Sequence, residues 1–237
     1  MSTSALETFW TDGFTMLPRL FAAEEIGWLA EEARGLAARL SGRPKQPVPS
    51  WVGDEAPEGT LFDIDVYEEP FRRLMAHPRL LTQVRALLPE PLYVYRTRLI
   101  GERPAKDAIW RRDMPTWRRL AGISAPRLIT AAVSLSDHAD APALFVQPGS
   151  QGMPATAPAP RPLVLPLGSV ALLHGDLSYA FHAERPAAGP IFLITYNALA
   201  NQPAFADQVG VGSFRPRPLD AVLGDDCLWP PAFACAG

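Results

Sequence analysis

The sequence predicts a protein that is mainly β with flanking helices, arranged as a double-stranded β-helix or jelly roll. Helical periodicity is concentrated in about the first 90 residues, and a series of short β-prone segments separated by turn residues follows it. The chain has 237 residues, 48% of them hydrophobic, which is enough to bury one sizeable core. We therefore expect a single domain over residues 1–237.

The helices are predicted from apolar spacing and from their boundary residues. Residues 22–40 form an amphipathic pattern in which apolar residues recur at steps of three and four from Ile26 onward, with acidic residues at the start. Gly42 followed by Pro44 should end this helix. Residues 71–88 predict one or two further helices, and Pro78 is expected to begin the second.

The strands begin after residue 90. Residues 92–100 alternate Tyr93, Tyr95, Thr97 and Leu99 against Val94, Arg96 and Arg98, which is typical of a β-strand. Further strands are expected at residues 128–135, 143–147, 163–165, 169–174 and 191–196. The proline- and alanine-rich residues 153–166 read as a loop. The expected division is a helical part over residues 1–90, a β core over 91–205 and a tail over 206–237.

Bulk properties exclude several classes of partner. The net charge of −3 indicates no nucleic-acid footprint, and no apolar run reaches the length of a membrane helix. The N-terminus lacks the basic start and apolar stretch of a secretory signal, so we expect a cytoplasmic protein. Cys227 and Cys235 are then expected to be free thiols. The oligomeric state does not follow from the sequence.

An ordered set of short motifs resembles the phytanoyl-CoA dioxygenase family, in particular its ectoine hydroxylase-like branch. These motifs, which span residues 9–205, are Phe9 to Phe14, Leu17-Pro18, Glu24-Glu25-Ile26, His77 to Leu81, Trp110-x-x-Asp113-x-x-Thr116-Trp117, Gly122-Ile123, Pro148-Gly149-Ser150, Gly168-Ser169-Val170 and Tyr196-Asn197-Ala198-x-x-Asn201. The resemblance implies a cupin-like double-stranded β-helix. It also implies a site in which two histidines and one carboxylate bind Fe(II) beside 2-oxoglutarate.

The resemblance also implies where the site residues should fall, and most of them differ here. The first iron-binding histidine falls on Arg111, the iron-binding aspartate is retained as Asp113, and the second histidine falls on Tyr179. The arginine that anchors the keto acid falls on Gly189 or a neighbour, and the histidine that usually follows Pro-Gly-Ser is Gln151. A guanidinium has no lone pair to offer a metal. The expectation is therefore a degenerate site with no metal.

Two interpretations of Arg111 and Asp113 remain open. Residues two apart in a strand share a face, so both should point into the barrel, within contact distance of each other and near the Tyr179 hydroxyl. Arg111 and Asp113 would then be either a salt bridge that fills the old metal position or part of a working site. In the working site, Arg111 would bind a carboxylate or stabilise an enolate. Tyr179 would be either core filling or a general acid or base.

The remaining candidates are expected around this centre. Trp110, Thr116, Trp117, Tyr95, Gln151 and His182 are predicted to contact substrate. His182 could replace the missing ligand only if three residues were inserted into the alignment, and His174 should face away from Tyr179 on a regular strand. Residues 137–140, Asp-His-Ala-Asp, read as a turn.

Three functions follow as hypotheses. The first is a metal-independent, non-oxidative enzyme (a cyclase, isomerase or dehydratase) that acts on a small-molecule biosynthetic intermediate and needs no cofactor. The second is a catalytically inactive ligand-binding or partner protein. The third is an Fe(II)- and 2-oxoglutarate-dependent hydroxylase with non-standard ligands. The reaction and the substrate do not follow from the sequence.

Overall fold

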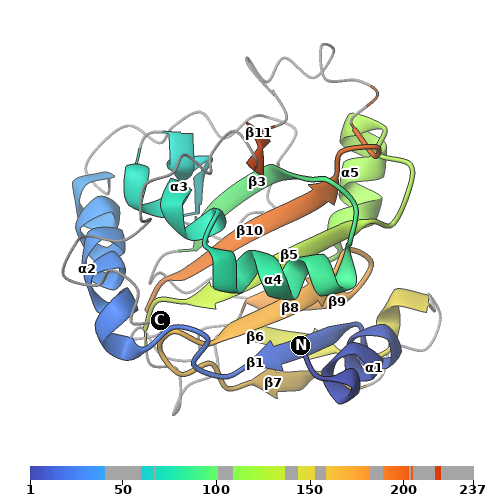
Figure 1. Cartoon of the computed structure of the whole chain (residues 1–237), viewed down its shortest axis with the longest axis horizontal. Helices are drawn as coiled ribbons and strands as arrows, with labels where there is room; N and C mark the ends of the chain where they lie inside the picture. The colour runs from blue at the N-terminus through green and yellow to red at the C-terminus, as the bar shows by residue number, and fades with distance from the viewer. Residues whose placement is uncertain are drawn as a thin grey trace.

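Two antiparallel sheets packed face to face form the centre of the molecule (Figure 1). The computed structural model describes residues 1–40, 60–66, 68–100, 109–136, 144–152, 159–181, 189–202, 204 and 217–219. The larger, seven-stranded sheet has the order β1-β8-β5-β10-β3-β11, with β2 also paired to β3, and the smaller, four-stranded sheet has the order β4-β9-β6-β7. The predicted two-sheet architecture with flanking helices is confirmed.

The strands have the following bounds: β1 Phe14–Leu17, β2 Leu61–Phe62, β3 Leu92–Ile100, β4 Ile109–Arg111, β5 Leu128–Ser134, β6 Leu144–Gln147, β7 Arg161–Leu163, β8 Val170–His174, β9 Ser178–Phe181, β10 Ile191–Ala198 and β11 Arg217–Pro218. The helices are α1 Thr3–Asp12, α2 Ala23–Leu40, η2 Ile64–Val66, α3 Glu69–Met75, α4 Pro78–Leu87, α5 Asp113–Ala121 and η3 Ser150–Gly152.

Helices α2 and α4 follow their sequence signals closely. The first begins one residue later than predicted, and the second begins at Pro78 as expected, because proline lacks the N–H that a first helical position leaves unused. His77 caps α4, and its Nδ1 atom accepts a hydrogen bond from the Arg79 amide at 3.2 Å. No helix in the described part of the chain combines the length and apolar character needed to cross a bilayer.

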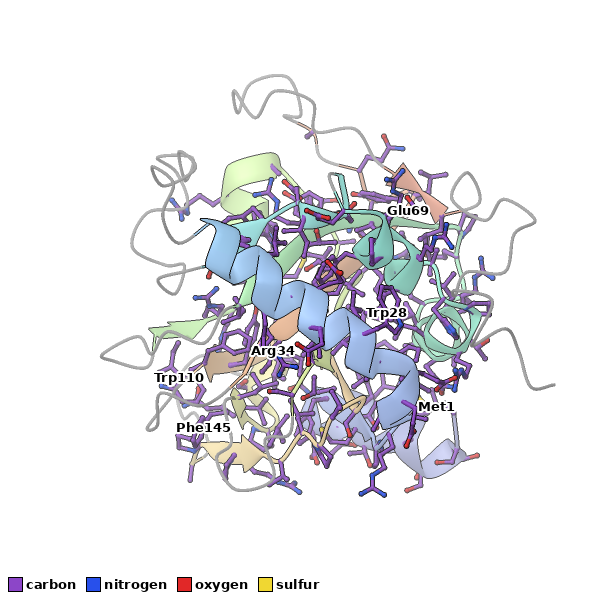
Figure 2. All side chains as sticks on the ribbon, turned by 90° about the vertical axis from the view of Figure 1, so that its left-hand side faces the viewer. Met1, Trp28, Arg34, Glu69, Trp110 and Phe145 are labelled. Atoms are coloured by element: carbon purple, nitrogen blue, oxygen red, sulfur yellow. The ribbon has the colours of Figure 1, made fainter. Side chains whose placement is uncertain are left out.

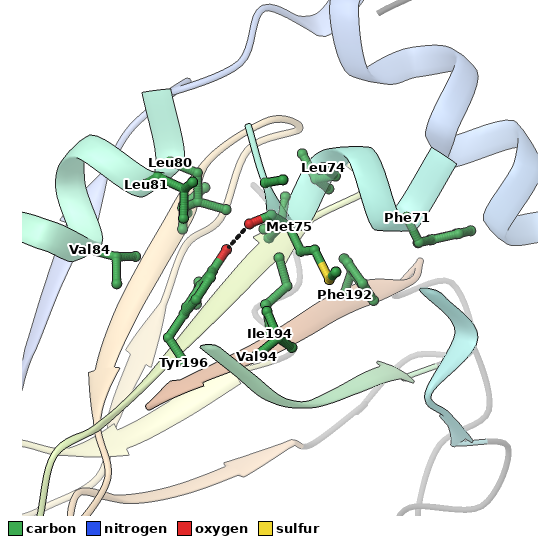
Figure 3. Packing of buried hydrophobic residues seen from close by; sticks show 14 of the residues in the cluster. Phe71, Leu74, Met75, Leu80, Leu81, Val84, Val94, Phe192, Ile194 and Tyr196 are labelled. Atoms are coloured by element: carbon green, nitrogen blue, oxygen red, sulfur yellow. Dashed lines mark hydrogen bonds between the residues drawn. The ribbon is translucent and has the colours of Figure 1, made fainter. Parts of the chain in front are cut away.

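The helices α2, α3 and α4 cover the outer face of the larger sheet. Figure 3 shows Phe71, Met75 and Leu80 packed over β10 and β3, where the Tyr196 hydroxyl donates a hydrogen bond to the Met75 carbonyl at 2.8 Å. A second apolar cluster fills the space between the two sheets. The site described below lies in this inter-sheet layer.

Strand β3 occupies the predicted residues but does not alternate regularly. Its pairing with β10 shifts between Thr195 and Tyr196, so Tyr95 is an extra residue in the ladder, a β-bulge. Val94 and Leu99 both belong to the helix-covered core, whereas Arg98 points between the sheets. The alternation expected from the sequence is therefore wrong beyond the bulge.

The division into one domain with a separate tail stays a prediction. Most of residues 206–237, including both cysteines, lie outside the described residues, as do residues 137–140.

Acidification should destabilise the fold through His77. This side chain is buried against Phe21, and burial, with a smaller contribution from the Arg79 charge, lowers its pKa to about 4. Between pH 6.5, the ordinary value, and about 4, the unfolded chain therefore takes up a proton that the folded chain refuses. The free energy of unfolding therefore does not depend on His77 protonation above pH 6.5. Between pH 6.5 and about 4 it falls by roughly 1.4 kcal/mol per pH unit.

Urea titrations of the wild type and of His77→Asn across this pH interval measure the effect. Asparagine keeps a capping acceptor but does not titrate. The stability gap between the two proteins should narrow as the pH falls, and a constant gap would contradict the assignment.

Candidate functional site

Asp113 lies at the junction of β4 and α5, in the layer between the sheets. Strand β4 ends at Arg111, Arg112 is the helix N-cap residue, and Asp113 begins α5. The Met114 amide donates to the Gly175 carbonyl at 2.7 Å, which ties the start of the helix to the turn between β8 and β9. The expected continuous strand through residue 113 is therefore wrong, because the chain turns into a helix there.

The Asp113 carboxylate accepts four hydrogen bonds from three side chains. Oδ1 accepts from Tyr179 Oη at 2.9 Å and from Arg98 Nη2 at 3.2 Å. Oδ2 accepts from Thr130 Oγ1 at 2.8 Å and from the same Arg98 nitrogen at 3.1 Å. A carboxylate offers about four lone-pair positions, so its hydrogen-bonding capacity is filled.

The arginine paired with Asp113 is Arg98 of β3, and the predicted ion pair between Arg111 and Asp113 is wrong. The bulge in β3 turns Arg98 inward, and both side chains of the pair are 5% exposed. Arg98 Nη2 also donates to Tyr179 Oη at 3.1 Å. Thr130 extends the network to the Thr195 hydroxyl at 3.0 Å. We call Arg98, Asp113, Thr130 and Tyr179 the buried cluster.

Arg98 and Tyr179 both keep their protons at neutral pH. Burial alone would lower the pKa of the Arg98 guanidinium, but the Asp113 carboxylate and Tyr179 reverse this, so the pKa lies above its ordinary value. Burial raises the pKa of the Tyr179 phenol well above its usual range, and Arg98 opposes only part of the rise. Tyr179 therefore stays protonated and acts as a donor to Asp113 rather than as a base.

Arg111 lies beside Tyr179 but outside this network. Its Cα is paired with that of Tyr179 across β4 and β9, so the two residues share the inward face of the smaller sheet. The Arg111 side chain is half-buried, with Cζ 5.9 Å from the ring centroid of Phe181. Among the three charged residues Arg98, Arg111 and Asp113, it is the one with access to solvent.

Trp110 lies on the opposite face of the smaller sheet from Tyr179. It precedes Arg111 in β4, is paired with Ala180 of β9 and is 38% exposed. Ala180 is also paired with Phe145 of β6, and Figure 2 shows Trp110 and Phe145 on the same side of the molecule. The register therefore does not bring Trp110 to the buried cluster.

Tyr95 and Trp117, both predicted to contact substrate, lie together in a buried aromatic pair. Their rings meet edge to face at 4.9 Å, and both are nearly fully buried. Arg96 Cζ lies 5.2 Å from the Trp117 ring centroid. Thr116, one residue earlier in α5, donates its hydroxyl to the Arg112 carbonyl at 3.1 Å. Tyr95 and Trp117 therefore belong to a small apolar cluster between β3 and α5.

The other predicted residues lie elsewhere or are not described. Gln151 donates from Nε2 to the carbonyls of Trp10 and Thr11 at 3.2 and 3.0 Å, which fixes the end of α1. His174 accepts from the Asp176 amide at 3.1 Å, and burial lowers its pKa. His182 lies outside the described residues.

Arg98, Thr130 and Thr195 were not predicted as site residues. One sequence signal for Arg98 exists, since a charged residue stands within a long β-prone segment. The structure shows that all nine residues of this strand are buried. An arginine in such a position needs a buried anionic partner, but the sequence does not say that the partner is Asp113.

A comparison with protein families identifies the chain. The profile of the family described as Phytanoyl-CoA dioxygenase (PhyH) matches residues 9–179. The chain belongs to the phytanoyl-CoA dioxygenase family. It is 30% identical to the ectoine dioxygenase of Halomonas elongata over 155 residues, which cover 63% of this chain and 46% of that enzyme. The chain spans about half the length of the curated relatives it matches.

Solved structures support the fold of this family member. EctD from S. alaskensis with 2-oxoglutarate and 5-hydroxyectoine matches with a TM-score of 0.73 and 22% identity, covering 86% of this chain and 78% of that one. The epimerase SnoN in complex with Fe3+, alpha ketoglutarate and nogalamycin RO matches with a TM-score of 0.66 and 19% identity, covering 91% and 93%. The predicted double-stranded β-helix is confirmed, and the structures named above contain iron or 2-oxoglutarate as bound groups.

The described side chains offer no such metal site. No group of three or more His, Cys, Asp or Glu residues within the described part of the chain is placed to hold a metal ion. Around Asp113 the buried cluster contributes one carboxylate, whose lone pairs are already used, together with a guanidinium and a phenol. These side chains do not fit an iron ion in this arrangement.

Proposed function

We propose that this chain is a metal-independent member of the phytanoyl-CoA dioxygenase family that acts on a small molecule without iron, oxygen or 2-oxoglutarate. One observation carries the proposal: the Asp113 carboxylate is saturated by Arg98, Tyr179 and Thr130. Asp113 is the one family ligand that the resemblance retains in this chain, and it has no lone pair left for a metal.

Electrostatics support the same proposal. Two unit charges about 4 Å apart repel by about 4 kcal/mol at an effective dielectric constant of about 20, and a dication doubles this cost. Any metal bound to Asp113 would lie beside the Arg98 guanidinium, which stays charged and is 5% exposed. The family's usual coordination would therefore require that Arg98 move away.

The expected position of the keto-acid anchor also supports the proposal. The resemblance places the family's arginine at Gly189 or a neighbour, and Gly189 lies two residues before β10 and faces Ser136. A Cβ atom at residue 189 would collide with the Ser136 side chain, so no longer side chain fits there. This close approach supports chemistry that does not use 2-oxoglutarate.

Within this proposal the buried cluster has a structural role, and Arg111 interacts with the substrate. Arg98, Asp113, Tyr179 and Thr130 hold the two sheets and α5 together. Arg111 supplies the positive charge for a substrate carboxylate or a developing enolate, because it is half-buried beside the buried cluster. Cyclisation, isomerisation and dehydration are the reactions of this kind. In the catalytically inactive alternative, the same residues would bind a ligand without converting it.

A second candidate function is an iron- and 2-oxoglutarate-dependent hydroxylase with non-standard ligands. The relatives favour it, since they carry names such as ectoine dioxygenase and L-proline trans-4-hydroxylase. Asp113 is retained, and His182 lies outside the described residues. This candidate requires Asp113 to exchange Arg98 for a metal.

Purified protein should retain no stoichiometric iron after anaerobic reconstitution and should form no succinate from 2-oxoglutarate. The reason is the filled carboxylate of Asp113 together with Arg111 and Tyr179 at the two histidine positions. Elemental analysis and a succinate assay measure the two outcomes, with a ferrous- and 2-oxoglutarate-dependent relative as the positive control. Stoichiometric iron with succinate formation would establish the hydroxylase instead.

A further inference from the structure

We propose that Arg98 is the resident cation of the buried cluster and that it excludes a divalent metal independently of the histidines missing at residues 111 and 179. This inference rests on the proposed metal-independent function and extends it, since it assigns the exclusion to a residue of β3 that is not at a family ligand position. The observation behind it is the position of a single nitrogen atom.

Arg98 Nη2 lies where a cation would bind. It is 3.2 and 3.1 Å from the two oxygens of Asp113 and 3.1 Å from the hydroxyl oxygen of Tyr179. Three oxygen atoms thus converge on one positively charged nitrogen. The point at which Asp113 and residue 179 meet is where the family holds its metal, and here a guanidinium fills it.

The backbone directs the Arg98 side chain toward this position. Its Cα is paired with Leu193 of β10 on one side and with Phe62 of β2 on the other. The bulge in the β3–β10 ladder fixes the inward orientation, and the side chain is 5% exposed. A guanidinium also cannot lose its proton in a protein, so a pH change would not remove the charge.

Arg98 also balances the charge of the centre. The pair with Asp113 is neutral, Tyr179 is protonated, and Thr130 is uncharged. A divalent metal added to this set would leave two uncompensated positive charges in a buried layer, whereas replacing Arg98 by a neutral residue would leave one. Restoring imidazoles alone is therefore not enough to restore metal binding.

The experiment compares two variants of the full chain with Co(II) as the probe. Arg111→His with Tyr179→His keeps Arg98, and the triple variant adds Arg98→Leu. Visible absorption of bound Co(II) and the shift of the melting temperature are measured. We expect no binding by the wild type or the double variant. The triple variant should bind Co(II) at least on the order of 100-fold tighter than any residual binding by the double variant, because the like charge has gone.

Matched variants keep the result interpretable. The control triple variant carries Arg118→Leu in place of Arg98→Leu and should bind no Co(II). Arg118 is an exposed residue of α5. If the Arg98→Leu triple does not fold, Arg98→Gln in its place retains a neutral donor for Asp113, and Co(II)-dependent folding of either variant supports the proposal.

Two results would overturn the role of Arg98. One is a double variant that binds Co(II) as tightly as the triple, and the other is a folded triple, with leucine or glutamine, that does not bind. Both results come from variants, so neither would contradict the proposed function, which the iron and succinate assays on the wild type test. Metal binding by the wild type itself would instead contradict the proposed function.

Discussion

Replacement of Arg98 by methionine should lower the free energy of unfolding by about 3–5 kcal/mol. The change removes two hydrogen bonds to Asp113 and one to Tyr179, and it leaves a 5%-exposed carboxylate without its counter-charge. Urea titration measures the loss. Arg118→Met, at an exposed position of α5, is the matched control and should change stability by no more than about 0.5 kcal/mol.

The double variant Arg98→Met with Asp113→Asn should recover most of this loss. Replacing both members of a buried ion pair by neutral groups of similar size is often nearly neutral, and the asparagine carbonyl can still accept from Tyr179 or Thr130. A double variant as stable as the wild type would show that the role of the pair is structural. No recovery in the double variant would contradict the description of Arg98 and Asp113 as a mutually compensating pair.

Replacement of Gly168 by alanine should have the second largest effect, a loss on the order of 3 kcal/mol. Gly168 has a φ of +78°, and a Cβ there would collide with the carbonyl oxygen of Phe21. The same glycine accepts the Phe21 amide at 3.1 Å and donates to the Ser134 carbonyl at 3.1 Å. Alanine would therefore separate the loop before α2 from the larger sheet.

Gly27→Ala is the control for this change. Gly27 lies in α2 with open space around its Cα, so alanine there should stabilise the protein by up to about 1 kcal/mol. Thermal and urea unfolding of both variants decide the comparison. If Gly168→Ala and Gly27→Ala changed the free energy of unfolding equally, the fold would tolerate a Cβ at Gly168 despite its close contact with Phe21.

Local signals predicted the parts of the fold that depend on local interactions. The range of β3, the start of α4 at Pro78 and the extent of α2 follow from periodicity and capping, which neighbouring residues determine. The turn of the chain into α5 at Asp113 was missed, because its start is stabilised by the Gly175 carbonyl, a partner distant in sequence. The strands β1 and β9 were missed as well.

The candidate site was predicted in part for the same reason. The register of β4 and β9 places Arg111 opposite Tyr179, and Tyr179 meets Asp113, as the resemblance to the family implied. The partner of Asp113 could not be predicted, because Arg98 and Asp113 come together only when β3 and α5 pack across the inter-sheet layer. Trp110 was predicted to contact substrate, but it follows the strand alternation and faces the opposite side of β4 from Arg111.

The bulge at Tyr95 makes the interior charge of this barrel depend on the pairing register of β3. If all residues of β3 were kept but Tyr95 were paired within the ladder, each later residue would slip by one position, which would turn Thr97 inward and Arg98 toward the helices. A one-residue slip in a strand that carries no metal ligand would then place a hydroxyl at the centre in place of the guanidinium. A comparison limited to the ligand motifs would miss such a change, whereas the pairing of β3 with β10 would reveal it.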